Sequence, residues 1–186
     1  MMQIYSVGHS NRSLQEFISV LSHYAVLTVI DVRSHPHSLA NPHFNKEVLE
    51  YELPRLSIQY CWMGEGLGGF RPQMPNDSPN TAWKVKSFKN YADYALTDAF
   101  SDSLSALTAL GTKQSTAIMC AEILWTRCHR RIIADHLLAL GWGVVHIVDA
   151  SRSTTHELTP FAKVDGARIT YPAPVLQYSL DHFQPE

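Results

Sequence analysis

The apolar segment at residues 26–32 restricts the possible folds of this chain more than any other part of its sequence. Only Thr28 and Asp31 interrupt it, and its apolar residues are mostly β-branched. A strand of this composition carries apolar side chains on both faces, so both faces need cover. That requirement is typical of a parallel sheet between two layers of helices.

The residues before this segment complete a strand–helix–strand unit. Residues 4–7 are a short apolar segment, and Ser13 and Glu16 form a capping box that begins a helix. Apolar residues follow at positions 14, 17, 18 and 21, which is the spacing of one buried helical face. Two parallel strands joined by a helix form a βαβ unit, whose crossover is expected to be right-handed.

Strands and helices continue to alternate along the rest of the chain. The pattern predicts strands near residues 58–63, 115–120, 144–148 and 168–171, helices over 46–53 and 128–140, a short helix near 159–163, one bent helix or two consecutive helices over 83–111, and loops over 34–44 and 64–79. We therefore predict an α/β fold, a single domain over residues 1–186 with a mostly parallel sheet flanked by helices.

Composition restricts the classes of function. The formal net charge of −2 over 186 residues argues against a protein that coats nucleic acid through an overall positive charge. No apolar run is long enough to span a bilayer, and the first residues lack a secretion signal. Three cysteines, an odd number, give no disulfide framework. We expect a cytoplasmic protein with reduced thiols and no membrane partner, and the sequence indicates no oligomeric state.

Polar residues follow three of the predicted strands at the point where each strand ends. They are His9 and Ser10 at the first strand, Asp31, Arg33 and Ser34 at the second, and Cys120 and Glu122 at the strand near 115–120. In α/β folds, ligands bind where loops leave the carboxyl ends of parallel strands. We therefore expect these three segments to converge on one pocket.

The segment from Cys120 to Arg130 is the main candidate for chemistry. Cys120 ends a predicted strand, and Cys128-His129-Arg130 begins the next predicted helix, with Arg127 just before it. Amides at a helix start and nearby arginines attract anions and lower the pKa of a thiol. Rhodaneses and cysteine phosphatases share this order of strand, cysteine, loop, arginine and helix, but this loop is one residue longer than their Cys-x5-Arg cradle and has no glycine. The alternative for Cys120 is a packing role at the strand end.

A metal site is a second interpretation of the same segment. Side chains of the types that bind zinc are Cys120, Cys128 and His129, with Cys61 or His9. Their spacing matches no zinc-finger pattern, and adjacent residues on a helix are expected to point to different faces. Histidines at positions 35, 37 and 43 could likewise form a metal loop, but the flanking Pro36 and Pro42 favour solvated loop residues.

A glycine-rich loop and a group of aromatic residues complete the candidates. Gly68 and Gly69 could bring backbone amides close to a phosphate, although the loop matches neither a dinucleotide-binding nor a P-loop pattern. Aromatic residues between positions 83 and 94 could stack on bases, but their helical spacing favours a place in the core.

Several short motifs resemble one bacterial and archaeal family along almost the whole chain. It is the family known only as domain of unknown function number 488. The motifs are Tyr5-Ser6-Val7-Gly8-His9-Ser10, Asp31-Val32-Arg33-Ser34, Asn41-Pro42-His43-Phe44-Asn45, Leu67-Gly68-Gly69-Phe70-Arg71, Met119-Cys120-Ala121-Glu122, the segment 125–131 and Thr155-His156-Glu157-Leu158-Thr159. The resemblance implies one pocket built from Ser10, Asp31, Arg33, Cys120, Glu122, Cys128, His129, Arg130 and His156, and it implies no particular reaction.

The leading hypothesis is a cysteine-dependent enzyme that acts on an anionic small molecule or a nucleotide-like group. Cys120 is expected to be the nucleophile or redox thiol and the more reactive cysteine, with His129 or His9 as proton shuttle. Glu122 and Cys128 complete the catalytic candidates. The binding candidates are His9, Ser10, Asp31, Arg33, Ser34, Gly68, Gly69, Arg71, Arg127, Arg130 and His156, with Arg33 and Arg130 as the anion clamp. The hypothesis assigns no metal ligand and no cofactor.

Two alternatives belong to other classes of protein. One is a noncatalytic module that binds a nucleotide or nucleic acid through the same arginines. The other is a metal-binding protein.

Overall fold

The computed structural model describes residues 2–75 and 77–174. Its centre is a six-stranded sheet with the strand order β3-β2-β4-β1-β5-β6. The strands are β1 (Gln3–Gly8), β2 (Thr28–Asp31), β3 (Gln59–Trp62), β4 (Thr116–Cys120), β5 (Gly143–Asp149) and β6 (Arg152–Thr155). The first five are parallel, and β6 pairs antiparallel with β5 at one edge. The predicted α/β fold with a mostly parallel sheet is therefore confirmed.

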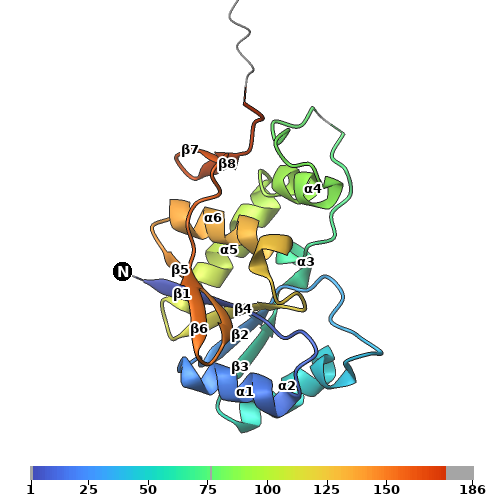
Figure 1. The fold of residues 1–186 in the computed structure, drawn as a ribbon, viewed down its shortest axis with the longest axis vertical. Coiled ribbons are helices and arrows are strands. Elements are labelled where there is room, and N and C mark those ends of the chain that lie inside the picture. Colours follow the sequence, from blue (N-terminus) through green and yellow to red (C-terminus); the bar gives the residue numbers. More distant parts are fainter. Residues whose placement is uncertain (1, 76, 175–186) are drawn as a thin grey trace, which may run out of the picture.

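Helices cover both faces of the sheet (Figure 1). One layer, below the sheet in the figure, consists of α1 (Leu14–His23) and α2 (Lys46–Arg55). The opposite layer contains α3 (Gly64–Leu67), α4 (Lys86–Tyr94), α5 (Asp98–Gly111) and α6 (Arg130–Ala139). Among the described residues, no helix has both the length and the hydropathy that a membrane crossing requires.

Alternation of side chains along the strands divides the core between these two layers. Val29 of β2 packs in the cluster under α1 and α2, whereas Ile30 of β2 and Ile118 of β4 pack in the cluster under α5 and α6. Because successive side chains of a strand point to opposite faces, Cys120 lies on the α5/α6 side and Asp31 on the α1/α2 side. This division decides which candidate residues can meet.

The amino-terminal unit agrees with its sequence pattern in detail. The hydroxyl of Ser13 accepts a hydrogen bond from the amide of Glu16 (3.2 Å), and the Glu16 carboxylate accepts one from the amide of Ser13 (2.7 Å). This is the predicted capping box, and it begins α1. The predicted loop at 64–79 differs at its start, where α3 forms one short helix directly after β3.

The carboxyl-terminal part differs from the prediction in two ways. The predicted helix near 159–163 is wrong: the Thr159 carbonyl accepts one turn hydrogen bond from the Ala162 amide (2.8 Å), and β7 (Lys163–Asp165) then pairs with β8 (Arg168–Thr170). A single turn makes too few hydrogen bonds to offset the cost of ordering a helix. β6 was not predicted either, because its four exposed residues show no apolar alternation.

Candidate active site

The three predicted strand ends meet at one edge of the sheet. β2, β4 and β1 are adjacent and parallel, with Gly8 opposite Cys120. Hydrogen bonds continue beyond the strands, from the His9 amide to the Cys120 carbonyl (2.9 Å) and from the Val32 amide to the Met119 carbonyl (2.9 Å). The prediction that these segments are parallel neighbours with a shared edge is confirmed.

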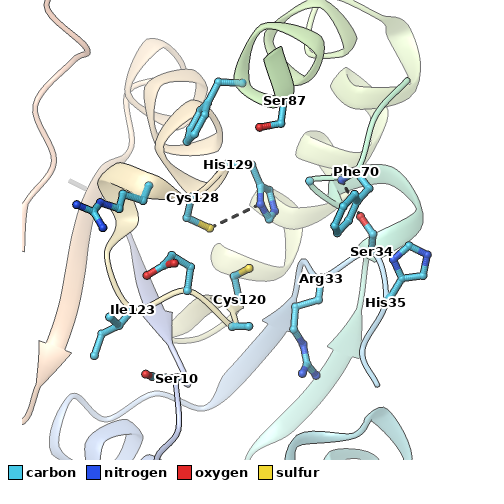
Figure 2. Close-up of a pocket in the computed structure, with 15 residues that line it drawn as sticks. Ser10, Arg33, Ser34, His35, Phe70, Ser87, Cys120, Ile123, Cys128 and His129 are labelled. Carbon is cyan, nitrogen blue, oxygen red and sulfur yellow. Dashed lines mark hydrogen bonds between the residues drawn. The ribbon is translucent and has the colours of Figure 1, made fainter. Parts of the chain in front are cut away.

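A cavity of about 580 Å³ opens at this edge (Figure 2). Most predicted site residues line it: Ser10, Arg33, Ser34, Gly69, Cys120, Glu122, Arg127, Cys128 and His129. The sequence analysis did not assign the other lining residues to the site: His35, Phe70, Ser87, Phe88, Ala121 and Ile123. Phe70 is the clearest of these, because it adjoins Gly69 and stays 79% exposed at the cavity.

Cys128 and His129 approach one another because both precede the regular part of α6. Cys128 has extended backbone angles (φ −128°, ψ 146°), and His129 is the N-cap residue of the helix, which begins at Arg130. The prediction that these adjacent side chains diverge is therefore wrong, since it assumed a helix from residue 128. Nδ1 of His129 lies 3.6 Å from Sγ of Cys128, and Figure 2 shows both groups facing the cavity beside Cys120.

The Cys128 sulfur is also the partner of a buried guanidinium. Nε of Arg130 donates a hydrogen bond to this sulfur at 3.2 Å. The same guanidinium donates to the hydroxyl of Ser6 (3.2 Å) and to the backbone carbonyl of Glu122, and the residue is 1% exposed. The sequence analysis expected Arg130 to line the cavity. Its guanidinium instead lies buried outside the lining, next to the Cys128 sulfur.

His129 is fixed in one orientation. Its Nε2 faces the backbone carbonyl of Val32 at 3.0 Å, and because a carbonyl only accepts, Nε2 must carry a proton. Nδ1 is therefore the nitrogen that can exchange a proton with Cys128. Gly69 covers the ring so closely that a Cβ there would lie 2.5 Å from Nδ1.

The two cavity thiols have opposite pKa shifts. Burial alone would raise the pKa of Cys128, but a hydrogen bond from Cys120 and the charges of His129 and Arg130 bring it well below its ordinary value. The pKa of Cys120 is raised well above its ordinary value, first by its hydrogen bond to Cys128 and then by burial. These shifts favour Cys128 as the thiolate, whereas the sequence analysis had favoured Cys120.

Arg33 belongs to a separate network on the α1/α2 side of the sheet. Its guanidinium donates to the Asp31 carboxylate through Nη2 (2.6 Å) and Nε (2.9 Å), and to the carbonyl of Phe44 (2.8 Å). The hydroxyl of Tyr60 donates to the same carboxylate at 2.6 Å. In Figure 2 the Arg33 guanidinium points away from the two cysteines, so only the stem of this residue faces the cavity beside them.

His9 belongs to this second network. Its Nε2 lies 3.1 Å from Nη1 of Arg33, and its ring stacks on Phe44 with centroids 4.1 Å apart. Burial and then the positive charge of Arg33 lower the pKa of His9 to about 4. His9 is buried among these partners and does not line the cavity, whereas His129 does.

The glycine-rich loop contributes Gly69 to the cavity wall, whereas Arg71 lies outside the lining. Arg71 donates to the carbonyls of Gly68 (2.9 Å) and Glu65 (2.7 Å) and lies over the ring of Tyr94. The hydroxyl of Ser34 accepts a hydrogen bond from the amide of Phe70 at 3.0 Å. The loop is thus held by its own side-chain contacts, and Gly69 is placed against the catalytic candidates.

His156 lies outside the cavity in a buried chain of polar groups. Its Nε2 contacts Asp135 (3.0 Å) and its Nδ1 contacts Nε2 of His146 (2.9 Å). Tyr171 donates to the second oxygen of the same carboxylate (2.8 Å), and Trp125 stacks flat on His146 at 4.1 Å. This chain supports the segment that leads from Trp125 to Cys128.

One group of side chains has the composition of a metal site. The ligand atoms of Cys120, Cys128 and His129 all lie within 4.8 Å of one another, and no other such group occurs among residues 2–75 and 77–174. These are donors that zinc accepts. Cys61 and His9, the further ligands considered from sequence, are not part of the group.

Fold and site together define an α/β protein with a paired-cysteine, histidine pocket at the carboxyl ends of its parallel strands. A family model, the domain of unknown function DUF488, matches residues 13–137. The chain belongs to this family, as its motifs indicated. No curated protein and no solved structure matches the chain.

Proposed function

We propose that the chain is an enzyme in which the Cys128 thiolate attacks an electrophilic atom of a small molecule held in the cavity. The contact from Nε of Arg130 to the Cys128 sulfur, at 3.2 Å, carries this proposal. A thiolate is a far better nucleophile than a thiol, and a fixed positive charge keeps it ionised. Arg130 is buried, so water does not screen its charge from the sulfur.

The neighbouring groups have distinct parts in this proposal. His129 exchanges a proton through Nδ1, the nitrogen that faces Cys128. Its Nε2–H group meanwhile keeps donating a hydrogen bond to the Val32 carbonyl. The amino end of α6, which begins at Arg130, lies at the same place, and the positive end of its helix dipole stabilises negative charge there. A thiolate of this kind is kept reduced in the cytoplasm, which is the location we propose.

We further propose that the substrate is a small molecule with an anionic group. Two arginines line the cavity, Arg33 and Arg127. Arg33 is paired with Asp31, whereas Arg127 has no carboxylate partner among the described residues. A volume of about 580 Å³ suits a molecule of nucleotide size. Phe70 and Phe88 add apolar walls to the same cavity.

Arg33 and Arg130 form hydrogen bonds inside the protein, and this favours an enzyme over a nucleic-acid-binding module. Such a module needs several free cations along its surface, but these two guanidiniums are 6% and 1% exposed and have internal partners. A bound metal is likewise disfavoured, because a dication between the sulfurs would lie beside the Arg130 guanidinium.

Thiol chemistry tests the nucleophile directly. At neutral pH, the ultraviolet absorbance of a thiolate should be present in the wild type and in Cys61→Ser, and absent in Cys128→Ser. Iodoacetamide should modify Cys128 first, as shown by peptide mass mapping. Phosphate should protect it, less so in Arg127→Ala and equally in Lys113→Ala, an exposed site. A fully protonated Cys128 at neutral pH, or zinc retained by the purified protein, would overturn the proposal.

A further inference from the structure

Two cysteines share the cavity, and each comes from a separate part of the fold. Cys120 is the last residue of β4, and Cys128 lies just before α6. Their sulfur atoms are within 4.8 Å of one another, and both residues line the cavity. Cys120 keeps part of its surface exposed, whereas Cys128 is 4% exposed. The nucleophile of the proposed enzyme therefore has a second thiol in reach.

We propose that Cys128 and Cys120 form a reversible disulfide with a small peroxide as the oxidant, so that the cavity reduces peroxides. The proposal rests on Cys128 as the nucleophile of the proposed function. It adds Cys120 as a resolving thiol, a role that the nucleophile alone does not require. A hydroperoxide has few heavy atoms, so it can reach a sulfur that lines an open cavity even where that sulfur is nearly buried.

Formation of the disulfide needs only the peroxide, and a thiol is needed only for the later reduction of the disulfide. The Cys128 sulfur attacks one peroxide oxygen, the O–O bond breaks, and the leaving hydroxide or alkoxide takes a proton from solvent. Cys128 is then a sulfenic acid, oxidised by two electrons. The Cys120 sulfur attacks the sulfenic sulfur, the S–O bond breaks, and the departing hydroxide takes the Cys120 proton to form water. A small-molecule or protein thiol reduces the disulfide and restores both cysteines.

The geometry allows the second step with a small movement. A disulfide has a sulfur–sulfur distance of about 2.05 Å, so the sulfurs must close from within 4.8 Å. Arg130 holds the Cys128 side chain, which leaves rotation of the partly exposed Cys120 as the simpler movement. Only residues 121–127 lie between the two cysteines, so little chain has to be ordered.

Arg130 also makes this disulfide easy to reduce. In the dithiol form its buried charge faces the Cys128 thiolate, and in the disulfide that negative charge is gone. The guanidinium then keeps only the Ser6 hydroxyl and the Glu122 carbonyl. Loss of a charge partner in a buried site is costly, so the reduced form is favoured. Disulfides whose reduced form is stabilised are oxidising and belong to catalytic sites.

Peroxide treatment of the reduced full-length chain tests the proposal, with Cys61→Ser as the matched control. Cys61 lies on β3 outside the cavity lining, and burial raises its pKa. One equivalent of hydrogen peroxide should give a Cys120–Cys128 disulfide in the wild type and in Cys61→Ser. In Cys120→Ser the reaction should stop at a Cys128 sulfenic acid that dimedone traps, with no disulfide formed. Cys128→Ser should form neither product.

The outcomes separate this inference from the proposed function. If iodoacetamide modifies Cys128 but peroxide leaves a lasting sulfenic acid in the wild type, the nucleophile stands and the resolving role of Cys120 is refuted. A disulfide that contains Cys61 also refutes it. If Cys128 reacts with neither reagent in a protein whose circular dichroism is native, both proposals fail.

Discussion

Asp31 and Arg33 are buried side by side, and each depends on the charge of the other. Asp31 is fully buried, and its carboxylate also accepts the Tyr60 hydroxyl. The stem of Arg33 borders the cavity while its guanidinium stays in this pair. Arg33 was expected to bind a ligand, but it instead holds the loop after β2 against the α1/α2 layer.

This arrangement predicts that Asp31→Asn is strongly destabilising and leaves the thiols as they are. Removing one partner of a buried pair leaves an uncompensated charge, which costs about 3–5 kcal/mol. Denaturant unfolding should show that loss, whereas Asp149→Asn, which removes a partly exposed carboxylate paired with Arg152, should have little effect. Cys128 in folded Asp31→Asn should be alkylated at the wild-type rate. A marked fall in that rate would place Asp31 in the catalytic site.

The loop elements set the shape of the cavity more than the strands do. Gly69 lies against His129, and Gly8 lies so close to the Glu122 carbonyl that a Cβ there would be 2.1 Å away. Backbone approaches of this kind leave room for glycine only. Gly69 therefore fits the loop after α3 against His129, and Gly8 fits the end of β1 against the β4–α6 connection.

Gly69→Ala should slow alkylation of Cys128 while the chain still folds. The added methyl group would press on the His129 ring, 2.5 Å from Nδ1, and move it from the Cys128 sulfur. Gly166→Ala is the matched control: nothing lies within 4 Å of its Cβ position, and its φ of +59° costs about 1 kcal/mol for alanine. Both variants should lose stability in thermal unfolding, but only Gly69→Ala should change the thiol reaction. Equal reactivity in the two variants would contradict the role given to His129.

Sequence patterns anticipated the five parallel strands and most helices, because each rests on apolar periodicity that burial demands. The shared edge of β1, β2 and β4 followed from topology. The sequence did not predict that Asp31 and Cys120 would lie on opposite faces of the sheet. Their faces depend on where each strand ends, and a shift of one residue would exchange them. The start of α6 shows the same limit: a shift from residue 128 to Arg130 turned two diverging side chains into neighbours.

At the scale of the whole molecule, three histidines among residues 2–75 and 77–174 are buried without a carboxylate directly paired to them. His9 lies on the α1/α2 side, and His136 and His146 lie on the α5/α6 side. Burial, as the main cause in each case, lowers their pKa values to about 4, about 4 and about 2. All three are therefore neutral in the folded protein at neutral pH, and protonation opposes folding on both sides of the sheet.

The sign of this effect predicts acid sensitivity. In the unfolded chain these histidines gain protons near the ordinary pKa of 6.5, whereas in the folded protein they do not until about pH 4 or below. The unfolded state thus binds more protons in this window, and the free energy of unfolding decreases as the pH falls. Each histidine contributes a loss of about 1–2 kcal/mol between pH 6.5 and about pH 5. Urea unfolding at a series of pH values measures the slope.

A substitution at His136 identifies its share of that slope. His136 packs against Phe100, and its Nε2 has no hydrogen-bond partner among the described residues. His136→Leu removes the titrating group without stranding a partner, so the pH dependence should become shallower by about one third if the three histidines contribute equally. His37→Gln, at an exposed position, should leave the slope unchanged. A wild-type unfolding free energy that stays constant from neutral pH to about pH 5 would show that these side chains are not held neutral by burial.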